Sequence, residues 1–146
     1  MSPSPGDDTL RAAIHDAGMR VTRARITVLR LLSHTDGPVS HADVTEALAG
    51  DGWDRATLYR NLMALTEAGL LRRVDMGDHV WRFERVTVRG DAHADDHPHF
   101  LCTACGDVAC LPAVDLRMGG VDLPRALAAG QVSIQLRGLC DECITV

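Results

Sequence analysis

The chain has 146 residues, a formal net charge of -5 and 46% hydrophobic residues, which suits one medium domain or two small ones. Aromatic residues make up only 3% of the chain, so we expect a packed core that is mainly aliphatic. No apolar run approaches the ~18 residues of a membrane span, and no signal peptide stands out, so the sequence favours a cytoplasmic protein without a membrane partner.

The negative charge is confined to the second half of the chain. Residues 1–73 hold nine arginines and nine acidic residues, whereas residues 74–146 hold six arginines and eleven acidic residues. The acidic half also contains all five cysteines and most of the histidines. Carboxylates beside such residues suit a cation site, and an ordinary solvated surface explains them equally well.

Four helices are expected in the first half of the chain, after a loose tail over residues 1–6. Each has apolar residues at helical spacing, and three begin at a residue whose side chain can cap a helix. Ser40, followed by Asp43 three residues later, is typical of a capping box. The expected helices are Thr9–Ala17, a helix capped by Thr22 that runs to Ser33, a helix opened by Ser40 that ends before Gly50, and Arg55–Ala68.

The fourth of these helices has two different faces. Leu58, Leu62 and Leu65 fall on one face, which we expect to be buried. The opposite face carries an arginine with a phenol and a hydroxyl on its flanks, which are the types that a helix needs to read a major groove. A solvated helix face explains this pattern equally well by itself. The candidate DNA-binding residues of the helix are Arg55, Thr57, Tyr59 and Arg60.

Two strands are expected after the fourth helix, over residues 70–74 and 79–85, with a turn at Met76-Gly77-Asp78. Arg72, Arg73 and Arg82 line this ribbon, where arginines can contact phosphates. Helices with a helix-turn-helix spacing followed by a basic hairpin are typical of a winged helix. We therefore expect a winged-helix DNA-binding domain over residues 7–85.

A polar stretch over residues 86–96 is typical of a hinge, and a second domain is expected over residues 97–146. Its expected elements are strands at 97–102, 107–111 and 131–137 and a short helical piece near 124–129. The expected fold class is α+β, with an N-terminal winged helix-turn-helix domain and a small C-terminal α/β dimerisation domain. So small a sheet buries little surface, so a homodimer interface is expected to complete it.

Two Cys-x-x-Cys pairs bracket the second domain, Cys102 with Cys105 and Cys140 with Cys143. Each pair can form a tight turn that points two thiolates at one position. Two such turns make the tetrahedral sulfur site that a structural zinc prefers, so we expect one zinc in each subunit. Disulfides or unused thiols are the alternative, which a reducing cytoplasm disfavours.

In their order and spacing, the motifs of this chain resemble the ferric uptake regulator family. The resemblance covers nearly everything from Leu10 to Cys143, and it implies a transcription regulator, usually a repressor, that binds double-stranded operator DNA as a metal-loaded homodimer. The matching motifs are Arg55-Ala56-Thr57-Leu58-Tyr59-Arg60-Asn61-Leu62, Ala68-Gly69-Leu70-Leu71, Arg82-Phe83-Glu84, His97-x-His99-x-x-Cys102-x-x-Cys105-Gly106 and Cys140-x-x-Cys143.

The resemblance also implies a regulatory site for a divalent metal at the hinge. His97 and His99 alternate on an expected strand and so point to the same side, and Glu84 closes the wing. The family's further histidine before the third helix is missing here, because its place falls near Pro38. Histidines with carboxylates suit Fe(II), Mn(II) or Zn(II), and a cysteine ligand would favour zinc. The candidate ligands are His97, His99, Glu84, Cys110 and His79.

Three other functions fit parts of the sequence. One is a peroxide-sensing regulator of the same family, in which bound iron oxidises a ligand histidine. Another is a zinc-containing thiol oxidoreductase, an enzyme that would use Cys110 on a substrate but would leave the winged helix unexplained. The last is a metal-buffering or protein-binding module that has lost DNA binding. We expect a regulator and not an enzyme.

Overall fold

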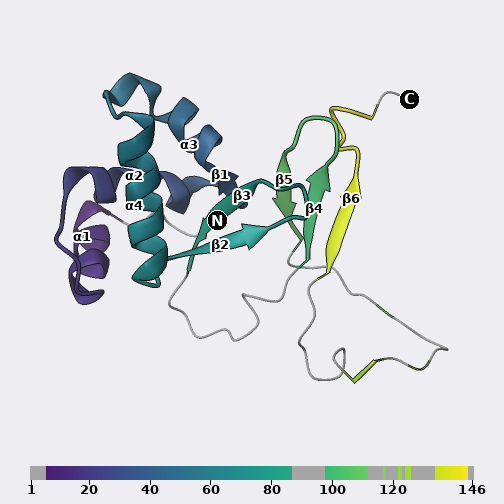
Figure 1. Cartoon of the computed structure of the whole chain (residues 1–146), viewed down its shortest axis with the longest axis horizontal. Helices are drawn as coiled ribbons and strands as arrows, with labels where there is room; N and C mark the ends of the chain where they lie inside the picture. The colour runs from purple at the N-terminus through teal and green to yellow at the C-terminus, as the bar shows by residue number, and fades with distance from the viewer. Residues whose placement is uncertain are drawn as a thin grey trace. The chain divides into compact units, whose positions relative to one another are not determined.

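The computed structural model describes residues 6–86, 98–111, 117, 122, 124–125 and 134–144. The chain divides into two compact units, Met1–Arg89 and Gly90–Val146, each with its own small sheet (Figure 1). Among the described residues, no helix is long and apolar enough to cross a membrane. The tail at 1–5, the expected hinge apart from Val86, and most of the helical piece at 124–129 lie outside the described residues.

The first unit is a winged helix in which every expected helix and strand is present. Its three-stranded antiparallel sheet has the order β1-β3-β2. The sequence did not predict β1, a strand of two residues that pairs with β3 just before the third helix. The elements are α1 (Asp7–Asp16), α2 (Arg23–His34), β1 (Val39–Ser40), α3 (His41–Ala47), a 3-10 turn (Ala49–Asp51), α4 (Arg55–Glu67), β2 (Leu71–Asp75) and β3 (Trp81–Arg85).

Local capping interactions set where the helices begin. At the start of α2, the Thr22 side chain accepts a hydrogen bond of 3.3 Å from the Arg25 N–H. At the start of α3, Ser40 and Asp43 form the predicted capping box, with reciprocal hydrogen bonds of 3.1 and 2.9 Å. Such contacts satisfy N–H groups that have no partner inside the helix. The short turn between α2 and α3 is thereby fixed from both sides.

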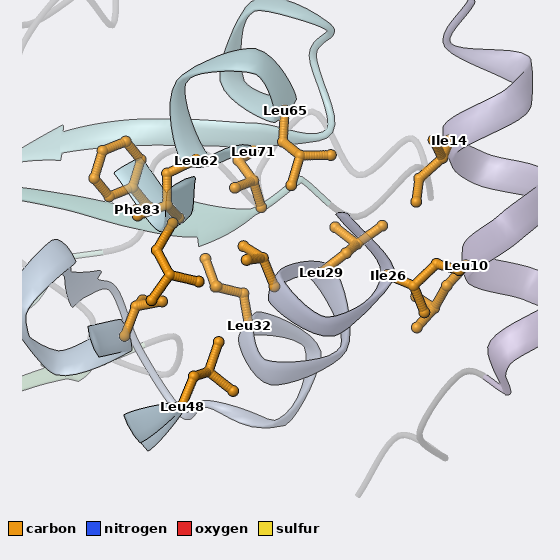
Figure 2. Close-up of a cluster of buried hydrophobic side chains, with 13 residues drawn as sticks. Leu10, Ile14, Ile26, Leu29, Leu32, Leu48, Leu62, Leu65, Leu71 and Phe83 are labelled. Atoms are coloured by element: carbon orange, nitrogen blue, oxygen red, sulfur yellow. The ribbon is translucent and has the colours of Figure 1, made fainter. Parts of the chain in front are cut away.

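A mainly aliphatic core holds the first unit together (Figure 2). Leu58, Leu62 and Leu65 of α4 are fully buried, as predicted, where the helix packs on α2 and β2. Phe83 of β3 is the one aromatic side chain in this buried cluster of described residues. Burying a leucine contributes roughly 1.5–3 kcal/mol to folding. This one face therefore anchors α4, and its opposite face points outward.

The second unit contains another three-stranded sheet, in the order β5-β4-β6. Strand β4 pairs antiparallel with β5 and parallel with β6. Parallel neighbours need a long connection, and 32 residues separate the end of β4 from the start of β6. The predicted strands are present but shorter, and residues 97 and 131–133 lie outside the described residues. The strands are β4 (His99–Cys102), β5 (Val108–Cys110) and β6 (Gln135–Gly138).

Candidate zinc centre and DNA-binding surface

The four predicted zinc ligands come together at one edge of the second sheet. Strand β4 ends at Cys102, and its parallel partner β6 ends at Gly138, which lies opposite Cys102 in the register. Because parallel strands have their carboxyl ends at the same edge, the two Cys-x-x-Cys turns that follow them meet there. The Sγ atoms of Cys102, Cys105, Cys140 and Cys143 all lie within 4.8 Å of one another.

Backbone hydrogen bonds shape the two turns and join them. The Cys143 N–H donates to the Cys140 carbonyl at 3.0 Å and closes the second turn. The Thr103 N–H donates to the Gly138 carbonyl at 2.8 Å and ties the first turn to the end of β6. Gly106, which follows the first turn, has a left-handed φ of 80° that glycine adopts without strain. These backbone hydrogen bonds therefore hold the two cysteine-bearing turns beside each other.

The arrangement and chemistry of the sulfur atoms suit zinc. The Sγ atoms of Cys105 and Cys140 are 3.8 Å apart, and a tetrahedral site with Zn–S bonds of ~2.3 Å has sulfurs at about this separation. The N–H groups of Cys105 and Cys140 lower the pKa of the Cys102 thiol to about 6. Hydrogen bonds with neighbouring thiols, that of Cys140 first, raise the pKa of Cys143 to about 12. Zinc binds cysteine as the thiolate, so its binding at this cluster would release protons.

The second unit also brings together two of the predicted regulatory ligands. His99 on β4 lies directly opposite Cys110 on β5, so the two side chains share one face of the sheet. A ring nitrogen of His99 lies within 4.8 Å of the Cys110 Sγ. His99 is buried and Cys110 is half-buried. Imidazole and thiolate are both ligands that zinc takes readily. His97, the other histidine of the motif, lies outside the described residues.

Glu84, another predicted ligand, lies near the end of β3 in the first unit. Its carboxylate accepts a hydrogen bond from Arg72 and forms an ion pair with it across the β2–β3 register. The exposed side-chain fractions are only 13% for Glu84 and 26% for Arg72. This ion pair therefore joins a predicted metal ligand, Glu84, to a predicted phosphate contact, Arg72.

The outward face of α4 carries the predicted DNA-binding residues at its N-terminal end. Arg55, Tyr59 and Arg60 are exposed to solvent. Thr57 is half-buried, and its hydroxyl accepts a hydrogen bond from the Arg60 guanidinium at 3.3 Å. The Thr57 N–H donates to the Asp54 carboxylate at 2.5 Å, which caps the helix and lowers the pKa of that carboxyl. The helix therefore presents two cations and a phenol from a well-defined start.

The wing, which is the hairpin formed by β2 and β3, differs in part from its prediction. Arg82 is buried, and its guanidinium donates to the Asp78 carboxylate at 2.9 Å, which lowers the pKa of that carboxyl. The prediction that Arg82 is available to phosphates is therefore wrong, because this arginine braces the turn of the hairpin instead. Arg73 stays at the surface, where its guanidinium carbon lies 4.1 Å from the centroid of the Trp81 ring.

Sequence reasoning missed two side chains of this surface. Trp81 is 50% exposed although it is large and apolar. His41 donates from Nε2 to the Arg55 carbonyl at 2.8 Å, and its ring lies 5.4 Å from the Tyr59 ring, so it holds the first turn of α4. The available signal is a tryptophan near the tip of the wing in a chain that has few aromatic residues.

The chain is similar to known proteins over most of its length. The sequence model of the ferric uptake regulator family matches residues 16–117. The peroxide operon regulator of Bacillus subtilis (strain 168) is 31% identical over 139 residues, which is 89% of this chain and 88% of that protein. Ferric uptake regulation protein 1 of Mycolicibacterium fortuitum is 34% identical over 118 residues, 80% of this chain and 66% of that protein.

Solved structures have the same fold. The crystal structure of the Vibrio cholerae ferric uptake regulator matches with a TM-score of 0.66 at 25% identity, over 89% of this chain and 98% of that one. A zinc-bound manganese uptake regulator matches with a TM-score of 0.67 at 20% identity, over 90% of this chain and 98% of that one.

The fold and the cysteine cluster define a winged-helix protein with a candidate zinc centre. The family model covers most of both the winged helix and the first zinc turn, and the Bacillus relative covers 89% of the chain. The chain belongs to the ferric uptake regulator family.

Removing one zinc ligand should unfold the second unit. We expect Cys140→Ser to lose zinc and the cooperative unfolding of residues 98–144, because binding of a structural zinc supplies roughly 10 kcal/mol or more of folding free energy. Zinc content and thermal unfolding monitored by circular dichroism measure this. Cys110→Ser is the matched control, since Cys110 is outside the four-sulfur cluster and should keep both. If Cys140→Ser retains zinc and cooperative unfolding, Cys140 is not a ligand of a structural zinc.

Replacing Arg60 should affect sequence reading rather than folding. Arg60→Ala removes an exposed side chain that donates a 3.3 Å hydrogen bond to the Thr57 hydroxyl, so stability should change little. Loss of a base contact should weaken binding to the preferred duplex by ~1–3 kcal/mol and relax discrimination at one base position. Binding to a randomised duplex library, read by sequencing, measures both. Glu67→Ala, at the far end of α4, is the control. Unaltered discrimination between duplexes by Arg60→Ala would contradict the placement of Arg60 against a base.

Proposed function

We propose that this protein is a metal-responsive transcription regulator that binds operator DNA as a homodimer, most simply as a repressor of metal uptake or homeostasis genes. The observation that carries the proposal is the family match over residues 16–117. In this proposal residues 7–85 form the DNA-binding domain, residues 86–96 the hinge, and residues 97–146 the dimerisation and metal-binding domain.

The charged face of α4 supports its placement in the major groove of DNA. Tyr59 and Arg60 would meet base edges, and Arg55, at the first position of the helix, would meet a phosphate. Thr57 holds Arg60 in place through the bond described above. Arg73 is placed to contact a phosphate from the wing. A regulator needs these two kinds of contact, one for register on the duplex and one for sequence.

Exposed apolar side chains of the second unit support a homodimer. Ile134, Leu139 and Ile144 are 37%, 47% and 52% exposed, respectively. A sheet with three strands of three or four residues has little core of its own, so a second copy would complete the burial. We place this dimer in the cytoplasm, where thiolates stay reduced and available to zinc.

The proposed metals are one structural zinc at the four cysteines of each subunit and one regulatory Fe(II), Zn(II) or Mn(II). We propose His97, His99 and Glu84 as regulatory ligands, with Cys110 beside His99 on the neighbouring strand. His79 is a predicted ligand too, but it lines a groove beside Tyr59 in the first unit. That position supports a role for His79 in DNA binding instead.

The proposed switch connects this metal site to the wing. His97 and His99 belong to the second unit and Glu84 to the first, so a metal held by all three would restrict the angle between the domains. Two DNA half-sites about one helical turn apart accept only a narrow range of recognition-helix spacing. The Glu84 carboxylate also pairs with Arg72, so its use as a ligand weakens that pair and makes Arg72 more available to a phosphate. Both effects favour the DNA-binding state.

Loss of either histidine should uncouple DNA binding from metal. For the wild type we expect metal to strengthen binding by about 5–150-fold, the usual range of allosteric coupling. His97→Ala and His99→Ala should lose this gain while keeping the dimer and the four-cysteine zinc, because neither residue is among the zinc ligands. Fluorescence anisotropy with labelled duplex, measured against metal concentration, tests this, with bound zinc quantified in parallel.

His15→Ala is the matched control for these histidine variants. His15 is an exposed residue of α1, with 81% of its side chain exposed, and should leave the metal response unchanged. If His97→Ala and His99→Ala respond to metal like the wild type, the regulatory site lies elsewhere.

Peroxide sensing is the second candidate function, favoured by the similarity to the Bacillus subtilis peroxide operon regulator. A sensor of this kind should lose DNA binding when its Fe(II)-loaded form meets hydrogen peroxide, and one ligand histidine should gain an oxygen atom. Peptide mass spectrometry and DNA affinity measure the two effects. The Mn(II)-loaded protein is the control, since it should stay unmodified. If the Fe(II)-loaded protein stays unmodified and bound to DNA, peroxide sensing is excluded and metal sensing is the function that remains.

We propose no enzymatic activity. Cys110, the thiol on which an oxidoreductase would depend, lies opposite a histidine in a sheet and outside the four-sulfur cluster. This placement suits a ligand more than a nucleophile that must reach a substrate. The winged helix also has no role in a thiol reductase.

A further inference from the structure

A groove of about 270 Å³ lies between α4 and the wing. Tyr59 and Met63 of α4 line one side, and Arg73, His79 and Trp81 of the wing line the other. His41, at the start of α3, and the buried Phe83 complete the walls. All lining residues belong to the first unit, so the groove is a feature of the winged helix itself.

The groove walls combine an arginine and two histidines with aromatic groups. Among the described lining residues, one is an arginine, two are histidines and none is acidic. The guanidinium of Arg73 stacks on Trp81, which is 50% exposed, and Tyr59 across the groove is 46% exposed. Exposed apolar side chains that gather in one place, as Tyr59, Val80 and Trp81 do here, often mark an interaction site. The charge and the exposure both indicate a ligand that is anionic at some positions and apolar at others.

The wing tip holds one of these groups in a strained backbone. His79 has a φ of 64° and is the one non-glycine residue with positive φ among the described residues. A histidine in this region is less stable than a glycine would be, and such positions cluster at functional sites. The His79 imidazole lies in the groove wall, where its N–H can act as a donor.

We infer that this groove receives the sugar-phosphate backbone of the DNA strand that borders the major groove entered by α4. The inference rests on the proposed function and adds Trp81 and His79 to the residues that contact DNA. Arg73 and the His79 imidazole match the phosphates, whereas Trp81 and Met63 offer apolar surface to deoxyribose. The groove opens directly beside Tyr59, so a strand seated in it continues from the bases that α4 reads.

The predicted contacts are with the backbone and therefore independent of sequence. Loss of such a contact weakens binding to all duplexes alike and reduces the dependence on salt, whereas loss of a base contact changes discrimination. The two kinds of contact can thus be separated by measurement. If a small apolar effector occupied the groove instead of DNA, it would not need the charge of Arg73. Trp81 would then make no contact with DNA.

Three variants test the inference on the full metal-loaded protein, with a duplex selected by the wild type from a random pool and an unrelated duplex as probes. His79→Gly should raise the thermal midpoint, because glycine relieves the strain, and yet weaken both duplexes by about tenfold. His79→Asn, which tolerates the same backbone and keeps a donor, should restore most of the affinity. Arg73→Met should reduce the salt slope by about one.

Direct contact is measured by fluorescence. The chain has two tryptophans, so Trp53→Phe leaves Trp81 as the single emitter, and its emission should change as duplex is added. Arg11→Met, an exposed arginine of α1 outside the groove, is the control and should keep the wild-type affinity. Normal binding of both duplexes by His79→Gly, a change in discrimination only, or constant Trp81 emission would overturn the inference. Failure of the wild type to bind any duplex would instead reject the proposed function.

Discussion

The parallel pairing of β4 with β6 is the constraint on which the second unit depends. It places Cys102 opposite Gly138 and brings two Cys-x-x-Cys turns from distant parts of the chain to one edge. A slip of one residue would move Cys140 by ~3.3 Å and reverse the faces of β6, which a four-sulfur site does not tolerate. Zinc and sheet register therefore stabilise each other. His99 lies on the same strand as Cys102, so the zinc also fixes the regulatory candidates His99 and Cys110.

In the first unit, arginines have separate roles that their local environments decide. Arg82 is buried on Asp78 and shapes the wing turn, and Arg72 pairs with Glu84 across two strands. Arg60 and Arg73 stay exposed, one on α4 and one over an aromatic ring. Residues 1–89 hold twelve arginines and twelve acidic residues, so the affinity of this unit for DNA must come from where its cations lie rather than from their number. The pairing of Arg72 with Glu84 links this distribution to the proposed metal site.

Local signals made much of the first unit predictable. The side chains of Thr22, Ser40 and Asp54 each cap a helix by accepting a hydrogen bond from a backbone N–H three residues later. The zinc ligands are predictable because they stand in two Cys-x-x-Cys pairs. What the sequence did not reveal depends on partners across strands. The two-residue β1 exists only through its pairing with β3, Arg82 is buried by its fold neighbours, and the groove needs α3, α4 and the wing together. Periodicity and spacing contain no direct record of such contacts.

We propose that this protein has two kinds of metal site, in which one zinc holds the fold and a second metal controls DNA binding. Native mass spectrometry of protein purified without added metal, combined with DNA affinity during titration of Fe(II), Mn(II) or Zn(II), tests it most directly. We expect a tightly held zinc in each chain and weak DNA binding until a second metal is bound. Full DNA affinity with the structural zinc alone would contradict it.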